Sequence, residues 1–146
     1  MSNSNIKLKI ITPEQTTLED IVDQITLPTT DGQITILPDH RSYIASLEAG
    51  EAMFKKNGKE IFLFISGGFI EFHDNELIVL ADTAERVEEI DLKKAEEARE
   101  KAEELKKQKI TMDESEFAKV AAAIEKESAR IRVARKHHTR RGMMIE

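Results

Sequence analysis

The sequence predicts an α+β protein in which an N-terminal antiparallel β-sandwich is followed by a C-terminal antiparallel two-helix hairpin. Three observations lead to this fold class. Short apolar stretches separated by turn residues fill residues 1–84, a spacing typical of all-β sandwiches and barrels. Residues 91–107 contain no glycine, proline or β-branched residue, which favours a helix. A second helical pattern follows a short break. We therefore expect two domains, residues 1–86 and 87–146.

The strands are indicated by alternation and by turn residues. Residues 6–10 alternate apolar and charged side chains, the period of a half-buried strand. A second strand is expected over residues 22–27, closed by Pro28. The Asn57-Gly58 dipeptide suits both central positions of a type I′ turn and predicts a hairpin. The other strands are expected at residues 34–36, 53–54, 61–65, 69–72 and 77–80.

The two helices are indicated by apolar spacing and by capping residues. Asp91 is a suitable N-cap for the first helix, and Thr111–Glu114 matches a capping box for the second. Alanines at spacings of three and four form the apolar face of the first helix. We expect a hairpin that is held lightly and can detach without unfolding the sandwich, because its large apolar side chains are few: Leu105, Phe117, Val120, Ile124 and Ile131.

Charge is distributed unevenly along the chain, whose net charge is −6. Residues 1–84 carry 6 basic and 13 acidic side chains, whereas residues 85–146 carry 16 and 15. An acidic body with a basic end predicts an acidic partner, which leaves open nucleic acid, a membrane surface, an acidic protein or the chain's own body. From Ser128 to Arg141 the sequence has no acid and six cations: Arg130, Arg132, Arg135, Lys136, Arg140 and Arg141.

Composition excludes several kinds of site. The chain has no cysteine, which removes disulfides, thiolate metal sites and cysteine nucleophiles. Its longest apolar runs have strand length, well short of the roughly 20 residues of a membrane helix. The first residues have neither the charged nor the apolar region of a signal peptide. His137 and His138 point to different faces of a helix and have no carboxylate nearby in sequence, so we expect no metal site.

Four segments, in order, resemble the epsilon subunit of bacterial F-type ATP synthases, and together they span nearly the whole chain. The family often has glycine where Thr35 and Asp39 stand, and Ala-Pro where Arg41-Ser42 stands. The segments that carry the resemblance are Gly32–His40, Leu47–Gly50, Ser66–Glu71, and Leu80–Glu85 with Ile90-Asp91.

The resemblance implies a non-catalytic central-stalk subunit that turns with the rotor. It implies a sandwich that contacts the gamma subunit and the c-subunit ring, and a hairpin that restrains ATP hydrolysis by reaching the beta and alpha subunits. It also implies peripheral attachment, through the complex, to the cytoplasmic face of a bacterial membrane. The residues at the implied contacts are Asp31, Gln33, His40 and Arg41 for the c-ring and gamma, and Arg130, Arg135 and Lys136 for the beta subunit.

Some family members bind regulatory ATP between the helices through an Ile/Leu-Asp-x-x-Arg-Ala motif. Here lysines stand where the family has arginines, and a lysine lacks the bidentate fork that grips phosphate. We therefore expect weak or absent ATP binding, no other cofactor, and Asp91 acting as a helix cap. The residues at the corresponding positions are Glu85, Asp91, Lys94, Lys101, Lys126 and Arg130.

Two other classes of protein are weaker alternatives. The runner-up is a nucleic-acid-binding module that uses the basic C-terminal helix on phosphates. Its acidic sandwich and its aromatic content of 5% argue against it, because stacking platforms for bases are scarce. The third class is a small enzyme, for which no catalytic constellation stands out.

Overall fold

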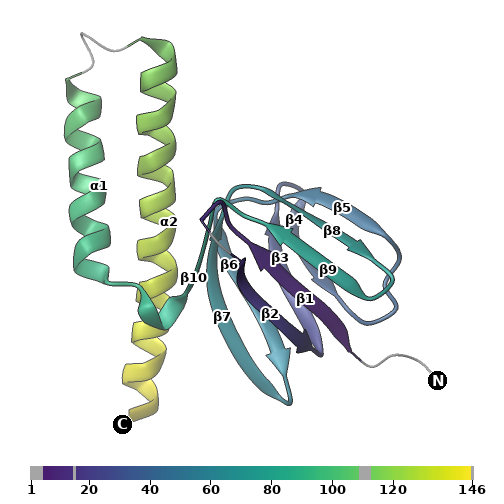
Figure 1. The fold of residues 1–146 in the computed structure, drawn as a ribbon. Helices are drawn as coiled ribbons and strands as arrows, with labels where there is room; N and C mark the ends of the chain where they lie inside the picture. The colour runs from purple at the N-terminus through teal and green to yellow at the C-terminus, as the bar shows by residue number, and fades with distance from the viewer. Residues whose placement is uncertain (1–4, 15, 109–112, 146) are drawn as a thin grey trace. The chain divides into compact units, whose positions relative to one another are not determined.

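The computed structural model describes residues 5–14, 16–108 and 113–145. The chain divides into two compact units, Met1–Arg86 and Val87–Glu146, called here the strand unit and the helical unit. The strand unit has two stacked sheets and the helical unit has two long helices (Figure 1). The predicted α+β class, a sandwich followed by a helical hairpin, is confirmed.

The strand unit contains two five-stranded sheets. The first sheet has the order β2-β1-β9-β8-β5 and the second β10-β7-β6-β3-β4. Neighbouring strands pair antiparallel, except that β1 pairs parallel with β9, an exception to the antiparallel expectation. The strands are β1 (Ile6–Ile11), β2 (Thr16–Val22), β3 (Gln24–Thr29), β4 (Gly32–Ile36), β5 (Tyr43–Ser46), β6 (Gly50–Lys56), β7 (Lys59–Ser66), β8 (Phe69–His73), β9 (Glu76–Leu80) and β10 (Thr83–Arg86).

The core lies between the two sheets and follows from the alternation in the sequence. Ile6, Leu8 and Ile10 of β1 are fully buried, while Lys7 between them is exposed. Each fully buried side chain of this size contributes about 1.5–3 kcal/mol of transfer free energy. The second sheet contributes Ile25, Leu27, Ile36, Ala52, Phe54, Leu63 and Ile65 to the same cluster.

The predicted hairpin at Asn57-Gly58 is confirmed. Both residues have positive φ, 52° and 78°, and they join β6 to β7. The strand expected over residues 22–27 is present as β3, but its expected start is wrong, because Val22 ends β2 in the first sheet and β3 begins at Gln24 in the second. Asp23 makes this reversal: its N–H donates to the Lys55 carbonyl at 2.7 Å.

Pro28 does not close its strand, contrary to expectation. β3 continues to Thr29, and Pro28 pairs with Gln33 of β4. The ladder between β3 and β6 has already ended at Thr26, so the missing N–H of Pro28 removes no bond from it. A proline is therefore tolerated at this point of the strand.

The helical unit begins with the 3-10 turn η1 (Val87–Glu89), followed by α1 (Leu92–Lys107) and α2 (Glu114–Ile145). Asp91 caps α1 as predicted, accepting the Lys94 N–H at 3.1 Å. The expected cap Thr111 lies outside the described residues. Within them, Asp113 caps α2, accepting the Glu116 N–H at 2.8 Å.

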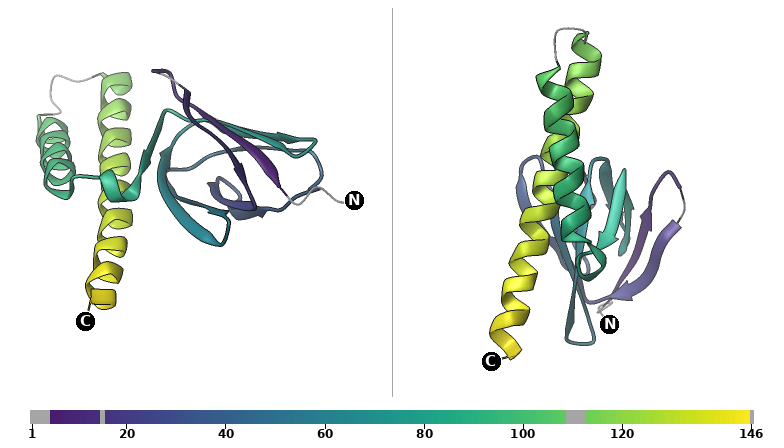
Figure 2. Two further views of the ribbon diagram at one scale, coloured as in Figure 1. Left: turned by 60° about the horizontal axis from the view of Figure 1, so that its bottom comes forward. Right: turned by 90° about the vertical axis from the view of Figure 1, so that its left-hand side faces the viewer.

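The two helices run antiparallel side by side, and α2 continues well past the start of α1 (Figures 1 and 2). α1 has 16 residues and α2 has 32, which correspond to lengths of about 24 Å and 48 Å. On α1, Ala95 and Ala102 are buried, whereas the larger Leu105 is 48% exposed. The apolar face of α1 is therefore built mainly from small side chains, as the sequence indicated.

Candidate interaction surfaces

The four residues predicted to contact the c-ring and gamma lie at two separate places. Asp31 and Gln33 flank Gly32 at the turn between β3 and β4, and both are exposed. His40 and Arg41 lie in the loop over residues 37–42, beyond the other end of β4. Five strand residues span about 16 Å, so these residues form two sites rather than one cluster.

The loop over residues 37–42 is fastened to the turn between β8 and β9. Asp39 donates its N–H to the Asn75 side-chain oxygen at 2.5 Å and accepts from the Asn75 amide nitrogen at 2.9 Å. Asp39 has φ of 66°, the left-handed conformation that glycine adopts most easily. The chain thus keeps this conformation at a position where the family often has glycine, and the Asn75 bonds offset the strain.

His40 and Arg41 differ in their surroundings. The His40 ring is half-buried, edge-on to Phe72 and to Tyr43 with centroid distances of 5.9 and 6.1 Å. Its Nδ1 lies 2.7 Å from the Arg41 carbonyl oxygen. Arg41 is exposed. His40 therefore anchors the loop, and Arg41 is the residue free to approach a partner.

An exposed apolar strip on the outer face of the first sheet was missed from the sequence. Phe69 pairs with Leu80, and Leu80 pairs with Ile11, so these three outward side chains cross β8, β9 and β1 side by side. Ile44 of β5 lies diagonal to Phe69 on the same face. Ile44 is 71% exposed and Phe69 46%. These four residues are called the outer strip. The alternation along residues 69–72 indicated a strand with two different faces, but it did not show which face lies outside.

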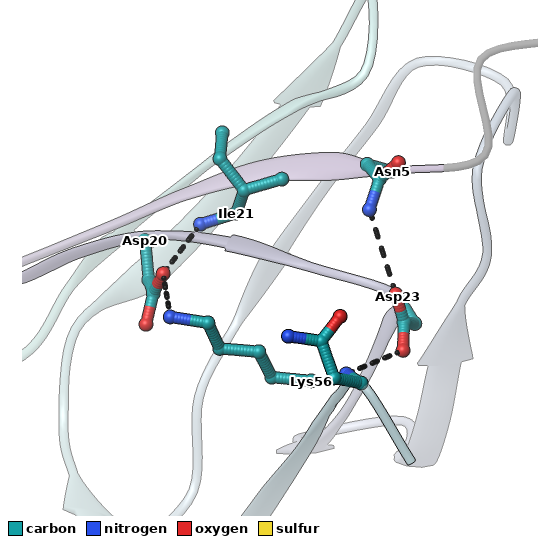
Figure 3. A network of polar contacts seen from close by, with 6 residues as sticks. Asn5, Asp20, Ile21, Asp23 and Lys56 are labelled. Atoms are coloured by element: carbon teal, nitrogen blue, oxygen red, sulfur yellow. Dashed lines mark hydrogen bonds and ion pairs between the residues drawn. The ribbon is translucent and has the colours of Figure 1, made fainter. Parts of the chain in front are cut away.

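A polar network joins the two sheets at one end of the strand unit (Figure 3). Lys56 of β6 donates to Asp20 of β2 at 2.7 Å, and the Ile21 N–H donates to the same carboxylate oxygen at 2.8 Å. The Lys56 hydrogen bond holds the pKa of Asp20 below its ordinary value of 3.8, against the opposing effect of burial. Asp23 accepts from the Asn57 N–H and from the Asn5 side chain at 3.0 and 3.4 Å. The network is structural, since each acid has a local partner.

The three predicted inhibitory cations project in different directions from α2. At 100° per residue, Arg130 and Arg135 are about 140° apart around the helix axis. Arg130 is bonded to Glu127 at 2.7 Å, and its side chain is 19% exposed. Arg135 is bonded to Glu96 of α1 at 2.6 Å and is 58% exposed. Lys136 is exposed. The three side chains therefore form no single stripe, and two of them already have acidic partners in the helical unit.

The residues at the family's nucleotide positions come from both units. Glu85 is half-buried in β10 of the strand unit. In the helical unit Asp91 uses its carboxylate as the α1 cap, and Lys94 and Lys101 are exposed on one face of α1, two turns apart. The half-buried pair on one face of α2 is Lys126 and Arg130.

Comparison with known proteins shows the family to which the chain is related. The model of the ATP synthase Delta/Epsilon chain beta-sandwich domain matches residues 5–87, more than half of the chain. The ATP synthase epsilon chain of Chloroflexus aggregans is 41% identical over 136 residues, which are 93% of this chain and 96% of that one. The epsilon chain of Trichlorobacter lovleyi is 37% identical over 131 residues, 90% and 94% of the two chains.

Solved structures agree as well. A chain of the Euglena gracilis mitochondrial ATP synthase superimposes with a TM-score of 0.73 at 25% identity, covering 88% of this chain and 81% of that one. A chain from the Tetrahymena thermophila central stalk and c-ring, at 17% identity and a TM-score of 0.54, shares the fold. The class is therefore that of non-catalytic ATP synthase subunits with a delta/epsilon sandwich.

The chain belongs to the ATP synthase epsilon chain family, as the sequence motifs predicted. Within the described residues, the helices include none with the length and apolar character needed to span a membrane.

Proposed function

We propose that this chain is a rotor subunit that joins the gamma subunit to the c-ring, and that its helical unit restrains ATP hydrolysis. The observation that carries the proposal is the pairing of two different surfaces in one family member. The strand unit exposes an apolar strip, and the helical unit ends in a long basic helix. Family membership favours this role over the alternative of a nucleic-acid-binding module.

The outer strip supports docking of the strand unit on gamma. Exposed apolar side chains that lie together on one sheet face are typical of protein-binding surfaces. Leu80 and Ile11 continue the strip from Phe69 across neighbouring strands, so a partner meets a continuous surface. Asp31 and Gln33 at one end of β4, and Arg41 at the other, are polar and exposed. We assign these polar sites to the c-ring and to the edge of the gamma contact.

The length of α2 supports the restraint of hydrolysis. α2 is about twice as long as α1, and its sequence beyond Arg130 is rich in cations, of which Arg135 contacts Glu96 of α1. A single exposed ion pair contributes only about 0–1 kcal/mol. Several of these cations are therefore needed together for a firm contact with an acidic segment of the beta subunit.

Regulatory ATP binding is proposed to be weak or absent. Lys94, Lys101 and Lys126 replace the arginines of the nucleotide-binding members, and each offers phosphate a point charge without a planar fork. Asp91 and Arg130 are already bonded within the helical unit. Titration calorimetry of ATP into the full chain tests this, and micromolar affinity would contradict it.

The test of the proposal is ATP hydrolysis by the cognate catalytic head with gamma, comparing the full chain with a chain that ends at Glu89. The truncated chain is expected to bind gamma and to release hydrolysis. A full-length variant with Arg130, Arg135 and Lys136 all changed to Gln separates charge from bulk, and should release most of the same activity. Equal rates with bound full-length and truncated chains would refute the restraint, and failure of both chains to bind gamma would refute the rotor role.

An apolar-to-charged substitution tests the strand unit separately. Phe69→Glu places a charge in the middle of the outer strip and should weaken gamma binding at least tenfold. Glu71→Gln, on the same face of β8, is the matched control and should bind normally.

Peripheral attachment to the cytoplasmic face of the membrane is proposed on the same grounds, because gamma and the c-ring would supply the attachment.

A further inference from the structure

Charged side chains connect the two helices toward each end of α1. Near the connection between the helices, Lys106 of α1 places its Nζ 5.7 Å from the centroid of the Phe117 ring. Near the start of α1, Arg135 of α2 donates from Nη2 to Glu96 Oε1 at 2.6 Å. The buried residues of α1 are Ala95 and Ala102. The Glu96–Arg135 contact is therefore a polar contact beside small apolar side chains, and it joins α2 to the first turns of α1.

Each charge of this pair has an unfavourable neighbour on its own helix. Glu96 lies four residues before Glu100, and Arg135 lies three residues after Arg132. Like charges at these spacings repel each other on a helix surface. Glu96 also has two cations at such spacings, Lys93 and Arg99, whereas Arg135 has no acid at these spacings on α2. The cross-helix pair therefore gives Arg135 an opposite charge that its own helix does not supply.

We propose that Glu96 is an intramolecular competitor for the acidic partner of α2. It occupies Arg135 in the closed hairpin, and the contact must break before Arg135 can meet the beta subunit. This inference rests on the proposed restraint of hydrolysis, and it names a contact that must break before α2 can restrain hydrolysis. The chemical class of the competing partner is a carboxylate-rich protein surface, because it must replace the Glu96 carboxylate.

The size of the effect follows from exposure. The two side chains are 58% and 41% exposed, and pairs of this kind shift an equilibrium by up to about fivefold. Screening reduces the effect further, since the Debye length falls from about 10 Å at 0.1 M salt to about 3 Å at 1 M. Loss of the contact should therefore shift the equilibrium between the closed and the open hairpin without unfolding the helices.

Amide exchange on the isolated full chain tests the contact directly. A 16-residue helix is marginal alone, so opening of the hairpin exposes the amides of α1 to exchange. Glu96→Gln should speed α1 exchange up to about fivefold at low salt and have no effect at 1 M. Glu96→Gln also removes the attractions of Glu96 to Lys93 and Arg99 within α1. Arg135→Gln leaves α1 unchanged, so it is the variant that assigns faster α1 exchange to the lost cross-helix contact.

Matched variants isolate the pair. Glu97→Gln removes the same charge from the next residue of α1, which is exposed, and should change exchange by well under twofold. Arg135→Gln should match Glu96→Gln, and the double variant should be no faster than either single one, because the pair acts as a unit. Equal effects of Glu96→Gln and Glu97→Gln, or additive effects of Glu96→Gln and Arg135→Gln, would overturn the proposal.

Hydrolysis by the cognate head with gamma then separates this proposal from the proposed function. Glu96→Gln should lower the concentration of chain for half-inhibition by up to about fivefold, and adding Arg135→Gln should reverse this gain. If truncation at Glu89 releases hydrolysis but Glu96→Gln changes neither exchange nor inhibition, the competitor is refuted and the restraint stands. If Glu96→Gln speeds exchange but truncation releases no hydrolysis, the restraint and the regulatory role of Glu96 are both refuted.

Discussion

Glycine at position 68 is expected to be indispensable, whereas glycine at position 58 is not. The two residues have similar backbone conformations, with φ of 90° and 78°. A Cβ at Gly58 would meet nothing within 4 Å, but a Cβ at Gly68 would run into the backbone carbonyl of Leu80. Replacing each glycine with alanine therefore imposes the same conformational strain at both positions and a backbone clash at only one.

The magnitudes follow from these two terms. A left-handed conformation costs a non-glycine residue about 1–2 kcal/mol, so Gly58→Ala should lose about that much stability. At Gly68 the clash adds about 1–3 kcal/mol, because Leu80 is held in the sheet by its pairing with Phe69. The Gly68 carbonyl also accepts the Leu47 N–H at 2.9 Å, so the loop has little room to shift. Gly68→Ala should lose about 2–5 kcal/mol in total.

Thermal unfolding followed by tyrosine fluorescence measures both losses. Tyr43 is the one tyrosine and the chain has no tryptophan, so the signal reports the strand unit alone. At about 4–8 °C per kcal/mol for a unit of this size, Gly58→Ala should lower Tm by roughly 5–15 °C and Gly68→Ala by clearly more. Gly67→Ala, whose Cβ would meet only the Asp82 side chain, should resemble Gly58→Ala. Equal Tm losses at Gly58 and Gly68 would refute the reasoning.

Three further outcomes are expected. Because Lys56 lowers the folded-state pKa of Asp20, the stabilisation is present above pH 3.8 and is lost as pH falls through the lower folded-state pKa. Asp20→Asn should therefore lose about 0.5–1 kcal/mol at pH 7 and progressively less as pH falls below 3.8, in urea titrations of both proteins. Asn75→Ala removes both bonds to Asp39 and should lower stability by about 1–2 kcal/mol, measured by the same titration; an unchanged midpoint would contradict it. Asp91→Ala should cost about 1 kcal/mol and speed amide exchange in α1 but not in the strands.

Local patterns predicted the elements that depend on neighbouring residues. Alternation over residues 6–10 identified β1, Asn57-Gly58 identified the β6–β7 hairpin, and Asp91 identified the start of α1. Each of these signals acts within a few residues of chain. The sequence therefore carried the fold class and most of the order of elements.

Long-range pairing was beyond the reach of these signals. The parallel pairing of β1 with β9 joins segments about 70 residues apart, and no turn residue encodes it. β5 and β10 are four-residue edge strands without a buried side chain, so their sequences carried too weak a pattern to reveal them. Val22 and Ile25 were predicted to lie in one strand. The chain reverses between them at Asp23, and this reversal is fixed by contacts with Lys55 and Asn57, far away in sequence.

The candidate surfaces were predictable by residue type and not by arrangement. Arg135 was expected to face an external acid, and its partner in the helical unit is Glu96, 39 residues away. Asp39 was noted as a departure from glycine, and the side chain that supports it, Asn75, lies in a distant turn. In each case the sequence supplies the charge or the strain, and the tertiary structure supplies its partner.

The most direct measurement of the central claim is ion-driven ATP synthesis by the cognate complex in vesicles, depleted of its own epsilon chain and supplied with this one. The full chain should restore gradient-driven synthesis. The chain that ends at Glu89 should restore it as well, because the strand unit carries the proposed gamma and c-ring contacts. Phe69→Glu should fail to do so at the same concentration. Synthesis at the same rate with and without the chain would contradict its role as the coupling between gamma and the c-ring.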